Sequence, residues 1–230
     1  MTTLHNGYKY ARKFFSAENA SSYDSVVHYA TFGRDTMWKN QILKLAYGRT
    51  DILDLASGTG ILSLLLARSG PANSRVISLD LTFEYLKIAK KKDSNNSFLV
   101  NGTAELLPYR EESFDTVVSS YLAKYANIES IVKESWRTLK RQGIVIFHDF
   151  TYPRNGITKK IWKAYFLFLK LIGKLIKHWA PVFKDLDKLI TTTSRWPEEM
   201  IECMKVNGFD KIHCNYYTWG TSAIIFARKP

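Results

Sequence analysis

Between residues 50 and 150, short apolar segments that suit β-strands alternate with longer amphipathic segments that suit helices. The strand candidates are 51–56, 75–80, 98–102, 114–120 and 143–150. Helical patterns lie between most of them, over 61–70, 83–92 and 128–140. Strands that alternate with helices of this length are typical of a parallel sheet covered on both faces. The alternation therefore predicts an α/β chain with a doubly wound sheet.

The first strand candidate, DILDLA, runs into a turn, SGTG, that contains two glycines. In an open α/β sheet, ligands bind outside the carboxyl ends of the strands. Gly58 and Gly60 let the backbone approach such a ligand, and the helix that begins near Ile61 points its positive end toward it. Asp54 either fixes this loop or receives an ammonium group of the ligand. Taken alone, the pattern also fits a tight turn with a helix-capping acid.

A second acid, Asp80, ends the next strand about twenty residues after the glycine turn, where a carboxylate can accept both hydroxyls of a ribose. The two features together predict a nucleoside site. Leu62 and Ser63 occupy the region of the third glycine of the dinucleotide pattern GxGxxG. A pyrophosphate needs the close helix approach which that glycine allows, whereas an adenosyl group that carries an amino acid does not. The pattern therefore favours S-adenosylmethionine over NAD.

Four stretches of the chain resemble class I S-adenosylmethionine-dependent methyltransferases. They are DLASGTG, VISLD, NGTAELLPYREESFDTVVSSY and WRTLKRQGIVIFHDF. More narrowly, the chain resembles the ubiquinone/menaquinone biosynthesis C-methyltransferase family. Residues 21–43 and 194–230 are similar to that family's N-terminal and closing segments. The resemblance spans most of the chain. It implies a Rossmann-like methyltransferase fold, with a seven-stranded, mostly parallel sheet whose last strand runs antiparallel.

The resemblance also implies where the cofactor is held. The methionine end is expected at Thr59 and its flanking glycines, and the ribose at Asp80. The adenine is expected at Thr103 and Ala104, and Tyr23 would close over the cofactor unless it only caps and packs a helix. The full set of expected cofactor residues is Tyr23, Asp54, Ala56, Gly58, Thr59, Gly60, Asp80, Leu81, Thr103, Ala104 and Ser120.

The segment after the fourth strand candidate, where the methyl acceptor is expected, departs from the family. The family's FGLRN pattern appears here as Tyr121-Leu122-Ala123-Lys124-Tyr125. Lysine preserves the charge of arginine but not its bidentate fork, and a tyrosine replaces an amide. The resemblance therefore leaves the identity of the substrate open, although methyl transfer is expected.

Methylation of a ring carbon requires electron density there, which deprotonation of a neighbouring hydroxyl supplies. A base is therefore expected at the strand ends. Asp149, at the position of the family's glutamate, and His148 are the candidates, and Lys124 would stabilise a phenolate. His148 fits equally well as a structural histidine that pairs with backbone at a strand end.

The chain is basic, since 33 Lys and Arg against 21 Asp and Glu give a net charge of +12. Such an excess indicates an anionic partner, either a membrane surface or nucleic acid. In a helix expected over 158–179, six lysines lie within about one third of the circumference. They are Lys159, Lys160, Lys163, Lys170, Lys174 and Lys177. The opposite side of the helix is apolar. This pattern suits a helix in an anionic membrane interface, where a polyprenyl substrate resides, but also an ordinary lid helix.

Two cysteines are too few for a disulfide framework or a metal site, so a reducing compartment and no metal are expected. No signal peptide or spanning segment is recognisable, and the expected location is cytoplasmic, peripheral on the inner face of the membrane. One domain is expected, with a helical cap (1–47), a cofactor-binding core (48–152), an amphipathic lid insertion (153–195) and closing elements (196–230). The sequence leaves the oligomeric state open.

Three functions stay open. The first is S-adenosylmethionine-dependent methylation of a ring carbon of a membrane-borne isoprenoid quinol precursor of the menaquinone or ubiquinone type. The second is methyl transfer to another small molecule, a lipid or RNA. Nucleic acid is disfavoured, because SSYLAKY after the fourth strand lacks the Asn/Asp-Pro-Pro-aromatic element of amino-nucleobase methylation. The third is a non-catalytic cofactor-binding subunit, which the intact glycine motif disfavours.

Overall fold

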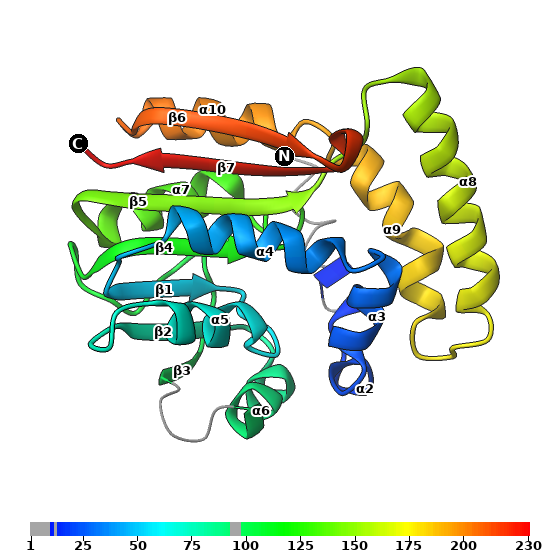
Figure 1. Cartoon of the computed structure of the whole chain (residues 1–230), viewed down its shortest axis with the longest axis horizontal. Helices are drawn as coiled ribbons and strands as arrows, with labels where there is room; N and C mark the ends of the chain where they lie inside the picture. Colours follow the sequence, from blue (N-terminus) through cyan, green and yellow to red (C-terminus); the bar gives the residue numbers. More distant parts are fainter. Residues whose placement is uncertain (1–9, 12, 93–97) are drawn as a thin grey trace.

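The computed structural model describes residues 10–11, 13–92 and 98–230. Its centre is a seven-stranded sheet with the order β3-β2-β1-β4-β5-β7-β6 (Figure 1). The strands are β1 (Asp51–Leu55), β2 (Arg75–Asp80), β3 (Phe98–Asn101), β4 (Phe114–Ser120), β5 (Leu139–Phe150), β6 (Asp210–Tyr217) and β7 (Ser222–Arg228). All pairs among β1 to β5 are parallel, whereas β7 pairs antiparallel with both β5 and β6. The predicted fold class is confirmed, including the antiparallel last strand.

Helices cover both faces of this sheet. They are α2 (Ala17–Ala20), α3 (Tyr23–Ala30), α4 (Arg34–Leu45), α5 (Ile61–Ser69), α6 (Phe83–Lys92), α7 (Ile128–Thr138), α8 (Gly156–Gly173), α9 (Ala180–Thr192) and α10 (Trp196–Val206). Neighbouring residues of one strand face different cores, because side chains alternate across a sheet. Val117 packs with residues of α7 and α10, whereas Val118 packs with residues of α4 and α5. Two apolar cores therefore hold the sheet from opposite sides.

The strand β5 begins earlier than the sequence predicts. The helix expected over 128–140 ends at Thr138, and β5 starts at Leu139 rather than at Gly143. Leu139 is fully buried and pairs with Phe114, and the register then shifts before Thr116 meets Ile144. The irregularity lets an apolar residue outside the recognisable strand pattern join the sheet.

The single helix predicted over 158–179 is wrong in its bounds. α8 runs over Gly156–Gly173, and its N-cap is Asn155, whose side chain accepts hydrogen bonds from the backbone of Ile157 and Thr158. A second helix, α9, follows a turn and starts at Ala180. The two helices pack closely at Gly173, where a Cβ atom would lie 2.8 Å from Phe183 Cδ2. The expected lid insertion is therefore a pair of helices, and Lys177 lies in the turn between them.

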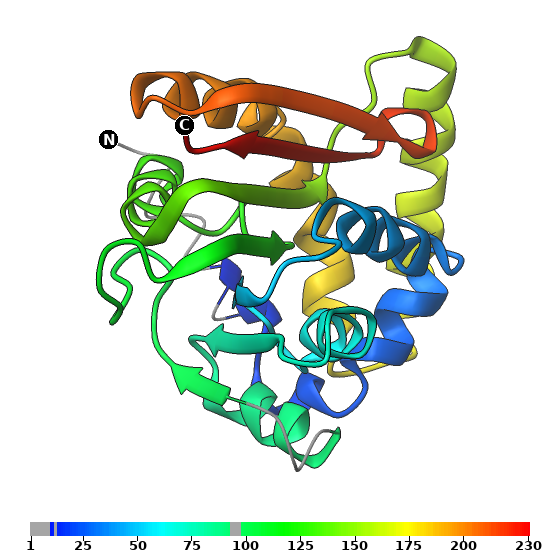
Figure 2. The ribbon, with the colours of Figure 1, turned by 60° about the vertical axis from the view of Figure 1, so that its left-hand side comes forward.

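The helices α3, α8 and α9 lie beyond the carboxyl ends of β1, β4 and β5, as Figures 1 and 2 both show. Aromatic and aliphatic side chains join α8 and α9 to the N-terminal segment in a third cluster, made of Phe14, Trp162, Phe166, Leu169, Trp179, Val182, Phe183, Leu189 and Ile190. Residues 1–9 and 12 of the expected helical cap lie outside the described residues. This third cluster places an aromatic wall opposite the strand ends.

Candidate functional site

The loop after β1 is the first part of the site. Ala56, Gly58 and Gly60 have φ angles of 54°, 57° and 78°, which is the left-handed region. The backbone N–H of Gly58 donates to Asp80 Oδ2 over 2.8 Å, and the N–H of Thr82 donates to Asp80 Oδ1 over 2.7 Å. Burial raises the pKa of the Asp80 carboxyl, while these two bonds stabilise its charged form. Asp80 thus pins the glycine loop and retains lone pairs for a further partner.

Gly60 permits close packing between two helices. A Cβ atom at Gly60 would lie 2.8 Å from the Ala89 Cβ atom on α6. Among the described residues, Gly60 lines none of the hollows described below. The glycine therefore permits the close approach of α6, and a direct contact of Gly60 with the cofactor stays a prediction.

A hollow, which we call the cofactor hollow, lies over the carboxyl ends of β1, β2 and β4. Eight of the predicted cofactor residues line it: Tyr23, Ala56, Gly58, Asp80, Leu81, Thr103, Ala104 and Ser120. Leu79, Leu122 and Ala126 add apolar walls to it. The sequence-based grouping of these residues is therefore reproduced in space, with the acids Asp80 and Glu105 beside apolar walls.

A smaller hollow continues from the glycine loop toward α3 and α4. Thr59 and Asp54 line it, together with Asp24, Asp35 and Lys39. Lys39 Nζ pairs with Asp35 Oδ2 at 3.0 Å, and both side chains are buried. We did not expect Asp35 and Lys39 from the sequence, because their charges look like the ordinary surface of a helix. The spacing of four residues between Asp35 and Lys39 could have indicated their pairing, since it places both side chains on one face of the helix.

Asp54 sits under this smaller hollow. Its Oδ2 atom accepts a hydrogen bond of 2.5 Å from Ser63 Oγ, and Ser78 Oγ donates in turn to Ser63 Oγ over 2.7 Å. Burial raises the pKa of Asp54 to about 7. The contacts match the loop-fixing role of Asp54, and its place in the lining leaves the second role, toward an ammonium group, as a prediction.

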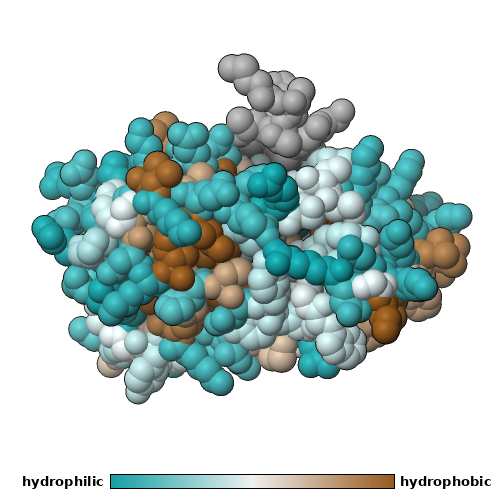
Figure 3. All heavy atoms as spheres, turned by 90° about the horizontal axis from the view of Figure 1, so that it is seen from above, coloured by the Kyte–Doolittle hydropathy of each residue, from teal (hydrophilic) through white to brown (hydrophobic). Residues whose placement is uncertain are grey.

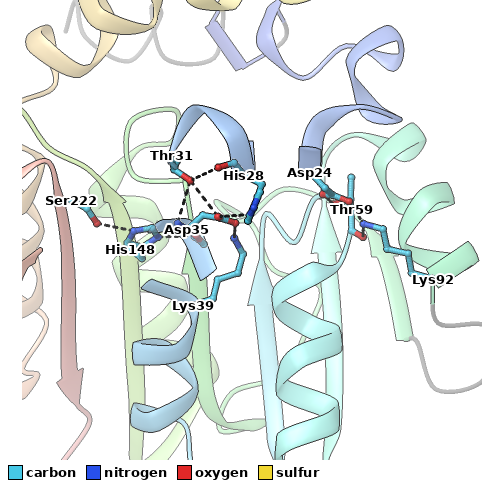
Figure 4. A network of polar contacts seen from close by, with 10 residues as sticks. Asp24, His28, Thr31, Asp35, Lys39, Thr59, Lys92, His148 and Ser222 are labelled. Carbon is cyan, nitrogen blue, oxygen red and sulfur yellow. Dashed lines mark hydrogen bonds and ion pairs between the residues drawn. The ribbon is translucent and has the colours of Figure 1, made fainter. Parts of the chain in front are cut away.

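A network ties α3 to the glycine loop, as Figure 4 shows. Thr59 Oγ1 donates to Asp24 Oδ1 over 2.5 Å. Lys92 at the end of α6 pairs with the same carboxylate and donates to the Thr59 carbonyl over 3.0 Å. Asp24 therefore fastens α3 across the methionine end of the predicted cofactor site.

A second, larger cavity of about 560 Å³ lies between the strand ends and the aromatic helices, and we call it the aromatic cavity. Its lining is mostly apolar and comes from α3, α8 and α9, including Val26, Trp162, Phe166, Val182, Leu186 and Ile190. It shares a wall with the cofactor hollow, made of Phe15, Tyr23, Tyr121 and Tyr125. Two ligands in these spaces would therefore meet across one aromatic wall.

One of the three predicted catalytic residues reaches the aromatic cavity. Asp149 is fully buried and lines the cavity. Lys124 forms an ion pair with Asp149 from behind, and the Lys124 backbone N–H donates to Asp149 Oδ2 over 3.3 Å. Burial lowers the pKa of the Lys124 ammonium. Asp149 also accepts from the Phe150 backbone N–H over 2.7 Å, so a carboxylate with an ion-pair partner lies at the edge of an apolar space.

His148 lies in a different place. Its Nδ1 atom is 2.8 Å from Ser120 Oγ and its Nε2 atom is 2.9 Å from Ser222 Oγ, so both ring nitrogens have partners. Burial lowers the pKa of His148, which favours the neutral ring. Among the described lining residues of the three hollows, His148 is absent. The ring nitrogens contact serine side chains rather than the backbone partner expected of a structural histidine, and they link His148 on β5 to β4 and β7, while a part of His148 in proton transfer stays a prediction.

Unpaired polar atoms test whether the hollows suit the predicted cofactor. The hydroxyl of Tyr85 lines the cofactor hollow and Ser57 Oγ belongs to a residue that lines the smaller hollow. Both oxygens are buried without a hydrogen-bond partner in the described part of the chain. An acidic group, apolar walls and unpaired hydroxyls are the groups that an adenosyl moiety with a polar amino-acid end requires. The residues that line the two hollows therefore fit S-adenosylmethionine.

Comparisons with known proteins identify the family of the chain. A model of the ubiE/COQ5 methyltransferase family matches residues 3–229. The ubiquinone/menaquinone biosynthesis C-methyltransferase UbiE of Rickettsia typhi is 31% identical over 222 residues, which cover 91% of this chain and 89% of that protein. A demethylmenaquinone methyltransferase of Oceanobacillus iheyensis is 31% identical over 215 residues, with 89% of each chain covered.

Solved structures show the same fold. A putative S-adenosyl-L-methionine-dependent methyltransferase from Methanococcus maripaludis superimposes with a TM-score of 0.68 at 16% identity, and 94% of each chain is covered. At this level of identity the likeness concerns the arrangement of strands and helices. It leaves the acceptor to be inferred from the residues of this chain.

Proposed function

Because the chain belongs to the ubiE/COQ5 methyltransferase family and is an S-adenosylmethionine-dependent methyltransferase, we propose that it methylates a ring carbon of an isoprenoid quinol precursor of the menaquinone or ubiquinone type. The observation that carries this proposal is the wall shared by the cofactor hollow and the aromatic cavity. A flat ring with an apolar tail fits a cavity with aromatic sides and few polar groups.

On the cofactor side, the residues around Asp80 hold the adenosyl part, and those around Thr59 hold the methionine part. When bound, S-adenosylmethionine supplies an electrophilic methyl group on a sulfonium cation. The rings of Tyr23, Tyr85 and Phe15 stand within 5.4 to 6.0 Å of one another, between their centroids. Aromatic faces attract cations, so this cluster favours a positive ligand on its cofactor side.

On the acceptor side, Asp149 is the group that moves a proton. It accepts the proton of a ring hydroxyl, which leaves an oxyanion and raises the electron density on the neighbouring ring carbon. Lys124 balances the charge of the carboxylate. Once the methyl group has passed from the sulfonium sulfur to that carbon, leaving a neutral thioether, the carbon's own proton leaves and the ring becomes aromatic again. The ring oxyanion then takes back the proton held by Asp149, so the net result is one methyl group gained and one proton released.

The finer proposal concerns the membrane. Between residues 151 and 184 the chain carries no acid and eight basic residues, namely Arg154, Lys159, Lys160, Lys163, Lys170, Lys174, Lys177 and Lys184. An acceptor with an isoprenoid tail resides in the bilayer, and this basic segment favours an anionic surface. We therefore propose a peripheral position on the inner face of the membrane.

No helix in the described part of the chain has both the length and the apolar character needed to cross a bilayer.

A labelled-methyl assay tests the reaction. We expect purified protein with S-adenosylmethionine to place the label on a ring carbon of a demethylmenaquinol analogue, as carbon NMR of the product shows. Label on oxygen or nitrogen, or transfer only to RNA or to other small molecules, would overturn the proposal. Leu186→Trp, which fills the aromatic cavity, should slow transfer to a long-tailed acceptor more than to a tailless one. Leu167→Trp is the matched control, because Leu167 is exposed on α8 and outside the described lining.

The basic segment is tested separately by charge reversal. Lys170 pairs with Asp187 at 2.5 Å, so its exchange would also break a contact between α8 and α9. The exposed Lys160, Lys163 and Lys174 are better sites. Each lysine near an anionic surface contributes about 1 kcal/mol at low salt, so the triple exchange to Glu should weaken vesicle binding about a hundredfold. Binding equal to that of the parent protein, at low salt, would remove the membrane from the proposal.

A further inference from the structure

Two tight turns at the aromatic cavity expose large aromatic side chains in a costly backbone conformation. Phe32, in the turn between α3 and α4, has a φ of 51° and is 77% exposed. Trp219, in the 3-10 turn Thr218–Gly220 between β6 and β7, has a φ of 57° and is 76% exposed. Both residues line the cavity. Left-handed backbone is unfavourable for bulky residues, and the exposed rings recover little of that cost by burial within the protein.

The two turns are braced rather than loose. Trp38 Nε1 donates to Thr218 Oγ1 over 3.2 Å, which ties α4 to the turn before Trp219. The Tyr165 hydroxyl on α8 donates to the Ala30 carbonyl just before Phe32. The rings of Phe32 and Tyr165 lie 5.6 Å apart between centroids. The exposed aromatic side chains therefore project from fixed points.

A third element adds to the same rim. Ile161 on α8 lines the cavity and is 56% exposed, and Ile157, one turn earlier, is more exposed still. Seen from above in Figure 3, small groups of brown and tan apolar atoms reach the surface at the end of the molecule that holds α8, while a larger brown area lies toward the other end. Segments far apart in the sequence thus place apolar side chains around one opening. Clusters of exposed apolar side chains mark surfaces that bind a partner.

The charges next to the rim indicate which partner. Arg34 lines the cavity and is exposed, and the exposed Lys160 directly precedes Ile161 on α8. The acid-free segment 151–184 supplies this part of the rim. Aromatic residues with basic neighbours are the composition of surfaces that enter the headgroup layer of anionic bilayers. A protein partner would need acids set among apolar groups, whereas an anionic bilayer offers both over any area.

We propose that Phe32, Ile161 and Trp219 enter the headgroup layer of an anionic membrane, so that the aromatic cavity opens directly into the lipid. The use of such an opening rests on the proposed function, because an isoprenoid tail could then slide from the bilayer into the cavity without crossing water. The proposal goes beyond the electrostatic attraction of the basic segment to the membrane, because insertion of the rim would fix the orientation of the protein, with the cavity opening toward the bilayer. The cofactor hollow then stays on the aqueous side of the shared wall.

The test exchanges the two aromatic side chains for asparagine, which tolerates left-handed backbone and so preserves the turns. Phe32→Asn with Trp219→Asn should weaken co-sedimentation with phosphatidylglycerol-containing vesicles by about one to two orders of magnitude. The matched control is Tyr47→Asn, because Tyr47 is 81% exposed but follows α4 at the opposite end of the strands. Vesicle binding of the double variant equal to that of the parent would overturn the inference.

Fluorescence gives a second measurement, made on the vesicle-bound parent protein and on a conservative variant that keeps an aromatic ring at position 219. Brominated lipids should quench the Trp219 signal, obtained as the difference between the parent and Trp219→Phe. An unquenched Trp219 in vesicle-bound protein would overturn the proposed orientation. If Trp219 is quenched but the parent methylates no quinol analogue, then the proposed function fails and the membrane surface stands. If the parent methylates a tailless quinol but Trp219 is unquenched, then only the surface fails.

Discussion

The cofactor hollow and the aromatic cavity share a wall but are held together by different forces. The cofactor hollow is built from loops that directly follow β1, β2 and β4, and hydrogen bonds such as those of Asp80 fix it. The aromatic cavity is closed by helices from distant parts of the chain that meet through apolar packing, as Trp162 and Phe183 do. Changes on the two sides should therefore have separable effects, on cofactor affinity in one case and on the use of the acceptor in the other.

The largest difference between the effect on turnover and the effect on cofactor affinity is expected from Asp149→Asn. The amide keeps the shape of the carboxyl but accepts no proton, so turnover should fall about 10²- to 10⁴-fold. Cofactor affinity should stay unchanged, because Asp149 lines the aromatic cavity and not the cofactor hollow. Single-turnover methyl transfer and titration calorimetry measure the two quantities. Near-full turnover of a folded variant would show that the proton moves elsewhere.

The converse separation is expected from Asp80→Ala. Loss of a charged hydrogen-bond acceptor costs about 1.5–3 kcal/mol, so S-adenosylmethionine should bind about ten- to a hundredfold more weakly. The matched control is Asp115→Ala, because Asp115 Oδ2 also accepts from backbone, at 2.9 Å from Thr50 N and 3.0 Å from Asp51 N. Asp115 sits at the amino ends of the strands, so its loss should lower the melting temperature without changing cofactor affinity. Equal cofactor affinity in Asp80→Ala and the parent would contradict the assignment.

The smallest effect is expected from Ser222→Ala, which leaves one nitrogen of His148 without its partner. A lost buried hydrogen bond costs about 1 kcal/mol, which should appear as a lower unfolding midpoint in urea. Turnover should change by less than about fivefold, within the effect of one neutral hydrogen bond. A loss of turnover as deep as that of Asp149→Asn, with an altered pH profile, would give His148 a part in proton transfer.

The cofactor side was predictable because its chemistry is local. Asp80 and Thr103 stand within a few residues of strand ends, and the carboxyl ends of parallel strands meet at one edge of the sheet. Strand patterns in the sequence therefore place these residues together. Gly60 is the exception, since the same backbone freedom serves helix packing against Ala89. A glycine pattern by itself does not separate these two uses.

The acceptor side was predictable only in part. Asp149 follows from the resemblance, but the pairing of Lys124 with it depends on how the segment after β4 turns. The break between α8 and α9 depends on the contact of Gly173 with Phe183, which lies on the following helix. Helical periodicity continues through such a break without a signal. Tertiary packing, rather than local pattern, decided the shape of the cavity.

The bond from Thr59 to Asp24 has a consequence for the order of events in a catalytic cycle. Asp24 fastens α3 to the glycine loop, and the preceding residue, Tyr23, lines both the cofactor hollow and the aromatic cavity. A movement of α3 large enough to let the spent cofactor depart would also uncover the acceptor side. If the cofactor departs by such a movement, exchange of the two ligands would be linked, and inhibition by either product should then report on the same opening step.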